Sequence, residues 1–379
     1  MAPRGRRHRA GVLLAATLAA AAVAAWSVPV PLFVVGPGPV VPVSRVVEVV
    51  EDAAGGAALW LTTIAAQQAT VGDLVRAAAD PDRDIVRWAD LIPRGQDLDT
   101  FLATNRRLME ESQQVAAYAA YRFLGRDAAL SAAGAEVLSV RPGSPADRAG
   151  ILPGDVVIAA GGRTVDLADD LSAALRDAAG GEQPWTLLRE GRRVQAVVTV
   201  DQAPSPEQLG VIAVSRDLRG RFVPPVRFRR GDVSGPSAGL AFGLYLVSRL
   251  DPDLLPSGGP IAATGTLRVD GGVKPVGGVA YKARAVARAG ARIFVVPAAN
   301  APEARAAAPG LRVIGVDSLA EAVAALRDAP LTPLFSHPYN DAGLEAIPVA
   351  YRHRRHSQAA GQDAAAFPPG HRRAPGVPW

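Results

Sequence analysis

The chain has 379 residues, of which 49% are hydrophobic and only 5% aromatic, so its cores should be aliphatic. Its formal net charge is +5, but arginines crowd both ends while acids and bases mix evenly between them. We therefore expect no nucleic-acid partner. The absence of cysteine excludes disulfides, thiolate metal sites and cysteine nucleophiles, and we expect neither a cofactor nor a metal ion.

The N-terminal end has the pattern of a membrane segment. Residues 1–9 are basic, and residues 10–28 carry no charge. As a helix the second stretch spans roughly 28 Å, close to a bilayer core of about 30 Å. We predict a cytoplasmic basic segment and then a single-pass transmembrane anchor in contact with membrane lipid, with a cleaved signal peptide as the alternative. In either case we expect the remainder to be extracytoplasmic, and with the anchor retained the protein lies in the cell membrane.

Residues 29–125 predict a connecting region, extended at first and helical later. Prolines and glycines between residues 27 and 44 favour an extended chain. Residues 58–64, ALWLTTI, indicate a strand. Residues 99–125 have apolar side chains at helical spacing and end on a glycine suited to a helix C-terminus.

Short strands dominate residues 126–202. A strand at 135–140 and a short helix at 144–149 precede a second strand, an amphipathic helix and a hairpin turning at Glu190-Gly191. With the segment GSPADRAGILPGDVVIAAGG, this order resembles a PDZ domain of the kind attached to bacterial proteases. The resemblance implies a groove that binds an extended chain by adding it to a sheet edge. A spacer that orients the next domain is the alternative.

Residues 203–335 mix strands and helices. A strand near FVPPVRF precedes the apolar helix SAGLAFGLYLVSRL, and a hairpin turns at Asp270-Gly271. A helix ending at Gly290 is followed by the strands RIFVVP and LRVIGV with flanking helices, which predicts a mixed sheet in a chain of the α+β class. Residues 336–379 lack periodicity and predict a disordered basic tail, either inert or bound to anionic lipid or cell-wall polymers.

Ser237 lies in the segment GPSAG, directly before the apolar helix. A serine in this place commonly caps the helix by bonding its free N–H groups. It can instead be a nucleophile if a neighbouring base takes its proton. None of the five histidines lies between residues 9 and 336, so we do not expect a Ser-His-Asp triad.

Lysine supplies the remaining candidate base. Of the 41 basic side chains only Lys274 and Lys282 are lysines, and arginine cannot act as a base because its guanidinium stays protonated. Lys282 is on an apolar helix, where burial without a counter-ion would lower its pKa. Lys274 is on a hairpin and is expected to be solvated. Chance placement of both lysines in this segment is the alternative.

Three of these segments together resemble a known protease family. The segment GPSAG, the pair Thr264-Gly265 before a hairpin, and GGVAYKARAVARAGARIFVVP resemble the protease domain of Lon-type serine endopeptidases. The order of anchor, PDZ domain and this domain resembles the bacterial PDZ-containing, membrane-anchored Lon-like proteases. The resemblance implies that Ser237 is the nucleophile, that Lys282 is the base and that Thr264 orients the lysine. It also implies that Gly235 lets backbone N–H groups cradle an oxyanion.

Two positions depart from the family pattern. The family often has Asp before Gly-Pro-Ser, where this chain has Ser234, with Asp232 two residues upstream, and it often has Glu at the position of Thr266. A phosphate loop of the form GxxxxGK[ST] is missing, because Lys274 is followed by proline and Lys282 by alanine. We therefore predict an ATP-independent, membrane-anchored serine endopeptidase that cleaves extracytoplasmic proteins or peptides. The alternative is a catalytically inactive PDZ adaptor anchored to the membrane, and an oligomer is possible in either case.

Overall fold

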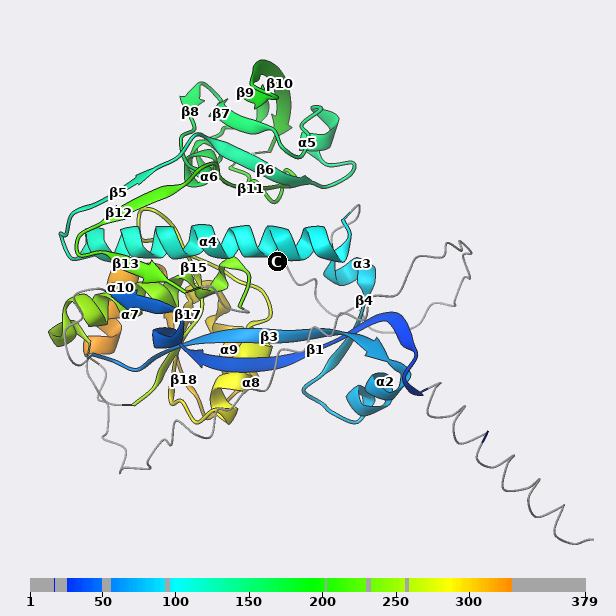
Figure 1. Cartoon of the computed structure of the whole chain (residues 1–379), viewed down its shortest axis with the longest axis vertical. Helices are drawn as coiled ribbons and strands as arrows, with labels where there is room; N and C mark the ends of the chain where they lie inside the picture. The colour runs from blue at the N-terminus through cyan, green and yellow to red at the C-terminus, as the bar shows by residue number, and fades with distance from the viewer. Residues whose placement is uncertain are drawn as a thin grey trace, which may run out of the picture.

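The computed structural model describes residues 17, 26–49, 56–92, 96–201, 203–229, 233–255 and 259–328 (Figure 1). The segment 10–28, expected to be a membrane anchor, lies outside the described residues except for residues 17 and 26–28. The basic segment 1–9 and the tail 336–379 lie wholly outside them. Among the described residues, no helix is both long enough and apolar enough to cross a membrane.

A six-stranded mixed sheet forms the larger domain, with strands in the order β18-β17-β14-β3-β1-β4. Strand β14 pairs in parallel with β3 on one side and β17 on the other, and β17 pairs in parallel with β18. The antiparallel partners are β1 with β3 and β4 with β1. The strands are β1 (Pro29–Pro42), β3 (Leu59–Thr70), β4 (Asp84–Arg87), β14 (Ile261–Ala263), β17 (Ile293–Pro297) and β18 (Arg312–Val316).

The structure corrects the expectation that residues 29–125 only connect. Strands β1, β3 and β4 from this segment make up half of the sheet, with Leu59 of β3 directly opposite Ile261 of β14. A parallel pairing between segments so far apart leaves no local pattern in the sequence. The local predictions are confirmed, because a strand begins at Leu59 and a long helix, α4 (Leu98–Phe123), precedes Gly125.

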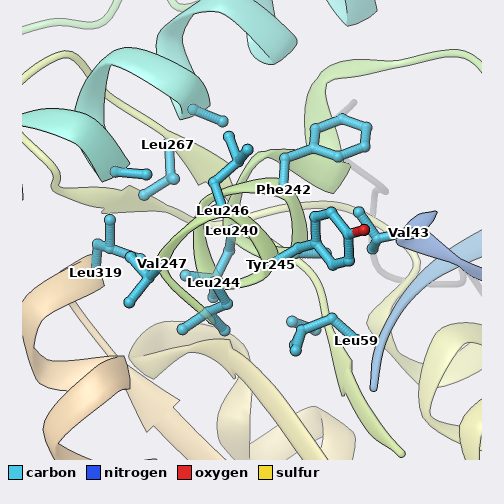
Figure 2. Close-up of a cluster of buried hydrophobic side chains, with 14 of the residues drawn as sticks. Val43, Leu59, Leu240, Phe242, Leu244, Tyr245, Leu246, Val247, Leu267 and Leu319 are labelled. Atoms are coloured by element: carbon cyan, nitrogen blue, oxygen red, sulfur yellow. The ribbon is translucent and has the colours of Figure 1, made fainter. Parts of the chain in front are cut away.

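Helices cover both faces of this sheet, and strand residues alternate between them. On one face α4, α7 (Gly239–Leu250) and α10 (Leu319–Arg327) pack against Leu61 of β3 and Ala263 of β14. Figure 2 shows this core around α7, with Leu59 beside Tyr245 and Leu319 beside Val247. On the other face α8 (Val279–Arg288) and α9 (Ala301–Ala307) pack against Trp60 and Ala262.

The second sheet belongs to the smaller domain and has the strand order β10-β9-β7-β6-β11, with β8 on β7. Its core includes Trp185, Leu187 and Val157. The predicted strand, short helix and hairpin are confirmed, and Ser144 caps the short helix through a bond from Asp147 N. The elements are β6 (Ala135–Val140), α5 (Pro145–Arg148), β7 (Val156–Ala160), β8 (Arg163–Thr164), α6 (Ala168–Arg176), β9 (Gly181–Arg189), β10 (Arg192–Val200) and β11 (Val211–Ser215).

The domain boundary expected at residue 203 also needs correction. Strand β11 pairs with β6 along Val211–Ser215, so the smaller domain continues past the expected boundary. A short apolar strand has the same sequence pattern in either domain, and only its pairing partner shows to which domain it belongs.

Helix α4 runs between the two domains (Figure 1). Three two-stranded sheets complete the described part of the fold: β5 with β12, β2 with β13 and β15 with β16. The remaining elements are η1 (Val43–Arg45), β2 (Val47–Val49), α2 (Val71–Ala78), α3 (Trp88–Leu91), β5 (Ala128–Ser131), β12 (Arg219–Phe222), β13 (Val226–Phe228), η2 (Pro236–Ala238), η3 (Pro252–Leu254), β15 (Thr266–Leu267), β16 (Val273–Lys274) and η4 (Ala298–Asn300).

Candidate active site

Ser237 sits in the short turn η2, between Gly235 and the first residue of α7. Gly235 has a φ of 93°, a conformation that strains residues with a side chain. Its N–H donates to the carbonyl of Asn105 on α4 at 3.0 Å. The N-cap of α7 is Ala238, and no side chain caps this helix, so Ser237 does not serve as its cap.

Four donors hold the backbone around Ser237. The carbonyl of Pro236 accepts hydrogen bonds from Ser112 Oγ at 2.9 Å and Thr266 Oγ1 at 3.2 Å. The carbonyl of Ser237 accepts from Gly265 N at 2.8 Å and Thr264 Oγ1 at 3.0 Å. These bonds to both carbonyls fix the backbone that carries the serine side chain.

The Ser237 hydroxyl faces the amine of Lys282. Lys282 Nζ lies 2.8 Å from Ser237 Oγ and 3.1 Å from Thr264 Oγ1. The Lys282 side chain is only 3% exposed. Burial, without a contribution from any charged partner, lowers the pKa of Lys282 to about 7. A large share of the amine is therefore neutral near pH 7 and able to accept the serine proton.

A glycine lies at the point where α8, the helix that carries Lys282, contacts strand β3. Gly278, the N-cap of α8, has a φ of 63°. A Cβ atom at this position would lie 2.2 Å from Ile64 Cδ1 of β3. A residue with a side chain here would have to adopt a strained backbone conformation and displace the end of the Ile64 side chain.

The other predicted positions lie as follows. Thr264 is completely buried, and its hydroxyl donates to Ser237 O and accepts from Lys282 Nζ. Thr266, at the position where the family often has Glu, bonds the Pro236 carbonyl. Ser234 is exposed at the surface. Asp232 lies outside the described residues.

Lys274, expected to be solvated, is half-buried. Its hairpin contacts the smaller domain, and Lys274 Nζ lies 3.4 Å from Ser172 Oγ on α6. The hairpin does turn at Asp270-Gly271, as predicted.

Sequence reasoning missed the contributions of α4. Asn105 and Ser112 bond the segment that carries Ser237, yet both precede it by more than a hundred residues and carry no motif. It also missed the segment from Asp82 to Asp84, which bonds to α8, the helix that carries Lys282. Asp82 pairs with Arg284 at 3.3 Å and also with Arg288, and Asp84 accepts a bond from Tyr281 at 2.5 Å. Only the helical spacing of the α8 partners could have indicated that they share one face.

The smaller domain contacts the larger one through α6 and β11. Asp169 of α6 accepts a hydrogen bond from Val269 N at 3.3 Å and pairs with Arg268 at 3.8 Å. Glu111 of α4 accepts from Ser215 N of β11 at 2.9 Å and from Ser215 Oγ at 2.5 Å. Val269 and Arg268 lie in the hairpin that follows Gly265, so α6 contacts the same hairpin whose first residues hold Ser237.

A serine hydroxyl bonded to a buried amine that lacks a counter-ion defines a Ser-Lys dyad, the base-and-nucleophile pair of a serine hydrolase domain. The family comparisons agree with this class. Residues 136–190 match the PDZ domain family, and residues 230–329 match the Lon protease (S16) C-terminal proteolytic domain. The chain therefore combines a PDZ domain with a Lon-type serine-protease domain, in a mixed α+β fold.

Relatives match over short segments. The Archaeal Lon protease of Halobacterium salinarum is 39% identical over 75 residues, 20% of this chain and 10% of that protein. Lon protease 2 of Bacillus subtilis is 32% identical over 89 residues, 24% of this chain and 16% of that protein. A Synechocystis protein named as a serine protease, HhoB, is 35% identical over 77 residues, 20% of this chain and 18% of that protein. The chain thus spans less than a fifth of the length of these curated relatives.

Among the described residues, no group of three or more histidine, cysteine, aspartate or glutamate side chains is placed to hold a metal ion.

Proposed function

We propose that this protein is an ATP-independent serine endopeptidase in which Ser237 is the nucleophile and Lys282 the general base. The single observation that carries the proposal is the 2.8 Å contact between Ser237 Oγ and the Lys282 amine. That amine is buried and its pKa is lowered to about 7. An arginine in the same place would remain protonated and could not accept the proton.

The reaction follows from the proton positions. The neutral Lys282 amine takes the Ser237 proton as Ser237 Oγ bonds to the carbonyl carbon of the scissile peptide. The resulting lysinium then gives its proton to the leaving amine, and the C–N bond breaks to leave an acyl-serine. Lys282 then takes a proton from a water molecule as the water oxygen bonds to the acyl carbon. The C–Oγ bond breaks, Lys282 returns the proton to Ser237 Oγ, and the acid product leaves and ionises to the carboxylate.

The amides at the start of α7 are suited to the oxyanion. Ser237 and Ala238 lie immediately before this twelve-residue helix, where backbone N–H groups and the helix dipole favour negative charge. The positive φ of Gly235 allows the chain to turn into this position.

The PDZ domain is proposed to bind the protein or peptide substrate. Strand β11 is the edge of its sheet, and Ser215 Oγ at the end of β11 accepts a bond from Ala168 N at the start of α6. An extended chain can add to such an edge beside the helix. Strand β11 and helix α6 both contact the protease domain, through Glu111 and Asp169, which would bring a bound chain close to the dyad.

We also propose that the protein is anchored in the cell membrane by residues 10–28 and acts on the extracytoplasmic side. This rests on the basic residues 1–9 followed by an uncharged stretch long enough to span a bilayer. Membrane fractionation of tagged protein in intact cells, followed by external protease treatment, tests it. Recovery of the full-length chain in the soluble fraction would contradict it.

The dyad is tested with casein or a fluorogenic peptide and the purified chain, with and without ATP. Ser237→Ala and Lys282→Arg should each lower turnover by about a thousandfold or more, because either change destroys the Ser237–Lys282 dyad. Wild-type kcat should rise with pH through about 7 as Lys282 loses its proton. ATP should change nothing.

The inactive adaptor is the competing outcome of this experiment. It predicts no wild-type turnover under any condition, with peptides still binding to the PDZ domain. Full activity in either variant would show that the dyad is assigned to the wrong residues.

A further inference from the structure

The Thr62 hydroxyl has no function in the site as described so far. It is buried, with the residue 3% exposed, and its Oγ1 atom has no hydrogen-bond partner among the described residues. A buried hydroxyl without a partner costs about 1–3 kcal/mol of stability. Such a group in a folded protein needs an explanation, and a catalytic role is one of the usual ones.

The alternation along β3 shows which way Thr62 faces. Leu61 belongs to the core beneath α7, whereas Trp60 belongs to the core beneath α8. Two residues beyond Thr62, Ile64 contacts Gly278 at the start of α8. Because side chains two apart on a strand share a face, Thr62 faces α8, between Trp60 and Ile64.

Register places Thr62 beside the dyad. Leu61 of β3 is directly opposite Ala263 of the parallel strand β14, so the next residues, Thr62 and Thr264, are neighbours. Helix α8 lies in the connection between parallel strands β14 and β17 and so runs antiparallel to β3. From the contact between Gly278 and Ile64, one turn along α8 covers about 6 Å and leads to Lys282. Two residues back along β3 cover about the same distance and lead to Thr62.

The chemistry of the amine supplies a reason for a third hydroxyl. A neutral lysine has two N–H groups and a lone pair, whereas the lysinium formed during the reaction has three N–H groups. Ser237 and Thr264 bond to this nitrogen, which leaves the third N–H of the lysinium without an acceptor in a buried site. We propose that Thr62 is a positioning residue whose hydroxyl accepts this third N–H, through a small shift of the amine or one bridging water, and so stabilises the protonated Lys282.

This proposal rests on the proposed function of the dyad and deepens it. The charged and titratable groups around α8 are Asp82, Asp84, Tyr281, Arg284, Arg288 and Glu303. Burial is the cause of the lowered pKa of Lys282, with no contribution from these groups. No charged group therefore competes with a hydroxyl that stabilises the protonated form of the Lys282 amine.

The test compares Thr62→Val, Thr62→Ala and Thr62→Ser in the full-length chain. The control is Thr63→Val, one residue along β3, whose hydroxyl already donates to Pro39 O at 2.7 Å. We expect Thr62→Val to lower kcat by roughly tenfold with little change in KM, in line with the loss of one hydrogen bond to a charged group. Thr62→Ser should restore kcat to near wild type, and Thr63→Val should leave it unchanged.

Titration of the amine tests the proposal without turnover. Only two lysines exist in the chain, so lysine labelled with ¹³C at the ε carbon gives one signal for Lys282 and one for Lys274 as an internal reference. The midpoint for Lys282 should fall by roughly one pH unit in Thr62→Val or Thr62→Ala, and stay near wild type in Thr62→Ser. The signal of Lys274 should not move.

The outcomes separate the two proposals. An unchanged kcat and an unchanged Lys282 midpoint in Thr62→Val would overturn the role of Thr62, as would a failure of Thr62→Ser to restore them. If Thr62→Val does not fold, Thr62→Ala decides by the same two readouts. Absence of wild-type turnover would instead contradict the proposed endopeptidase, and the lysine titration would still decide whether Thr62 contacts the amine.

Discussion

The two lysines of the chain occupy contrasting regions of the same domain. Lys282 is buried between α8 and the sheet, where its partners are the hydroxyls of Ser237 and Thr264. Lys274 is half-buried between the β15–β16 hairpin and the PDZ domain, where it contacts Ser172 and its charge acts on the Glu111 carboxyl.

The difference shows how environment decides what a lysine can do. Burial alone lowers the pKa of Lys282 to about 7, which makes it a base. At the interface, burial raises the pKa of the Glu111 carboxyl, while hydrogen bonds from Ser215 and the charge of Lys274 oppose that change. The charge of Lys274 therefore acts on a carboxyl at the interface, whereas the amine of Lys282 lies beside the Ser237 hydroxyl.

The largest test of this contrast is the stability of Lys282→Met. Below about pH 7 the amine is protonated in both folded and unfolded chains, and burying it costs on the order of 4 kcal/mol. Between about pH 7 and pH 10.5, the ordinary pKa of lysine, the unfolded chain binds more protons than the folded chain, so wild-type stability rises with pH. Lys282→Met should therefore raise the free energy of unfolding most at pH 6 and least at pH 10, as measured by urea unfolding.

Lys274→Met is the matched control for that measurement. It should show no comparable gain at pH 6. A gain for Lys282→Met that did not change with pH would contradict the burial of an uncompensated amine.

A smaller effect is expected at the interface from Glu111→Ala. The change removes the acceptor of Ser215 N and Ser215 Oγ and leaves both donors without their partner. The expected loss is about 2 kcal/mol in the free energy of unfolding. The neighbouring Glu110→Ala alters an exposed side chain of the same type on the same helix and should stay within about 0.5 kcal/mol of wild type. Equal losses of stability in the two variants would show that the bonds of Glu111 do not stabilise the interface.

Local patterns predicted most elements of both domains. The apolar run after Ser237, the Asp270-Gly271 turn and the Glu190-Gly191 turn depend only on neighbouring residues, and the structure has a helix and two hairpins at those places. Pairings between distant segments were not predictable in this way. The sequence predicted a strand at residues 58–64, but not that β1 and β3 lie in the sheet of the protease domain.

The residues of the candidate site divide in the same way, into those that local patterns predicted and those that depend on contacts between distant segments. The absence of histidine from the folded part and the scarcity of lysine directed attention to Ser237 and Lys282, which the structure brings within 2.8 Å. The residues that hold the serine from α4 were not found, because Asn105 and Ser112 act through single bonds formed only in the folded chain. Thr62 was seen only as part of a strand, because its importance depends on register with β14.

The smallest expected effect is that of Lys274→Met on both stability and activity. Its contact with Ser172 is long, at 3.4 Å, and its charge lies among partly exposed groups. Such interactions are worth about 0–1 kcal/mol and weaken as salt screens them. We expect a loss below about 1 kcal/mol at low salt that shrinks at 0.5 M salt, with kcat within about twofold of wild type. Peptide turnover that disappears in Lys274→Met but survives in Lys282→Met would reverse the roles of the two lysines, because only the base of the dyad is required for the chemistry.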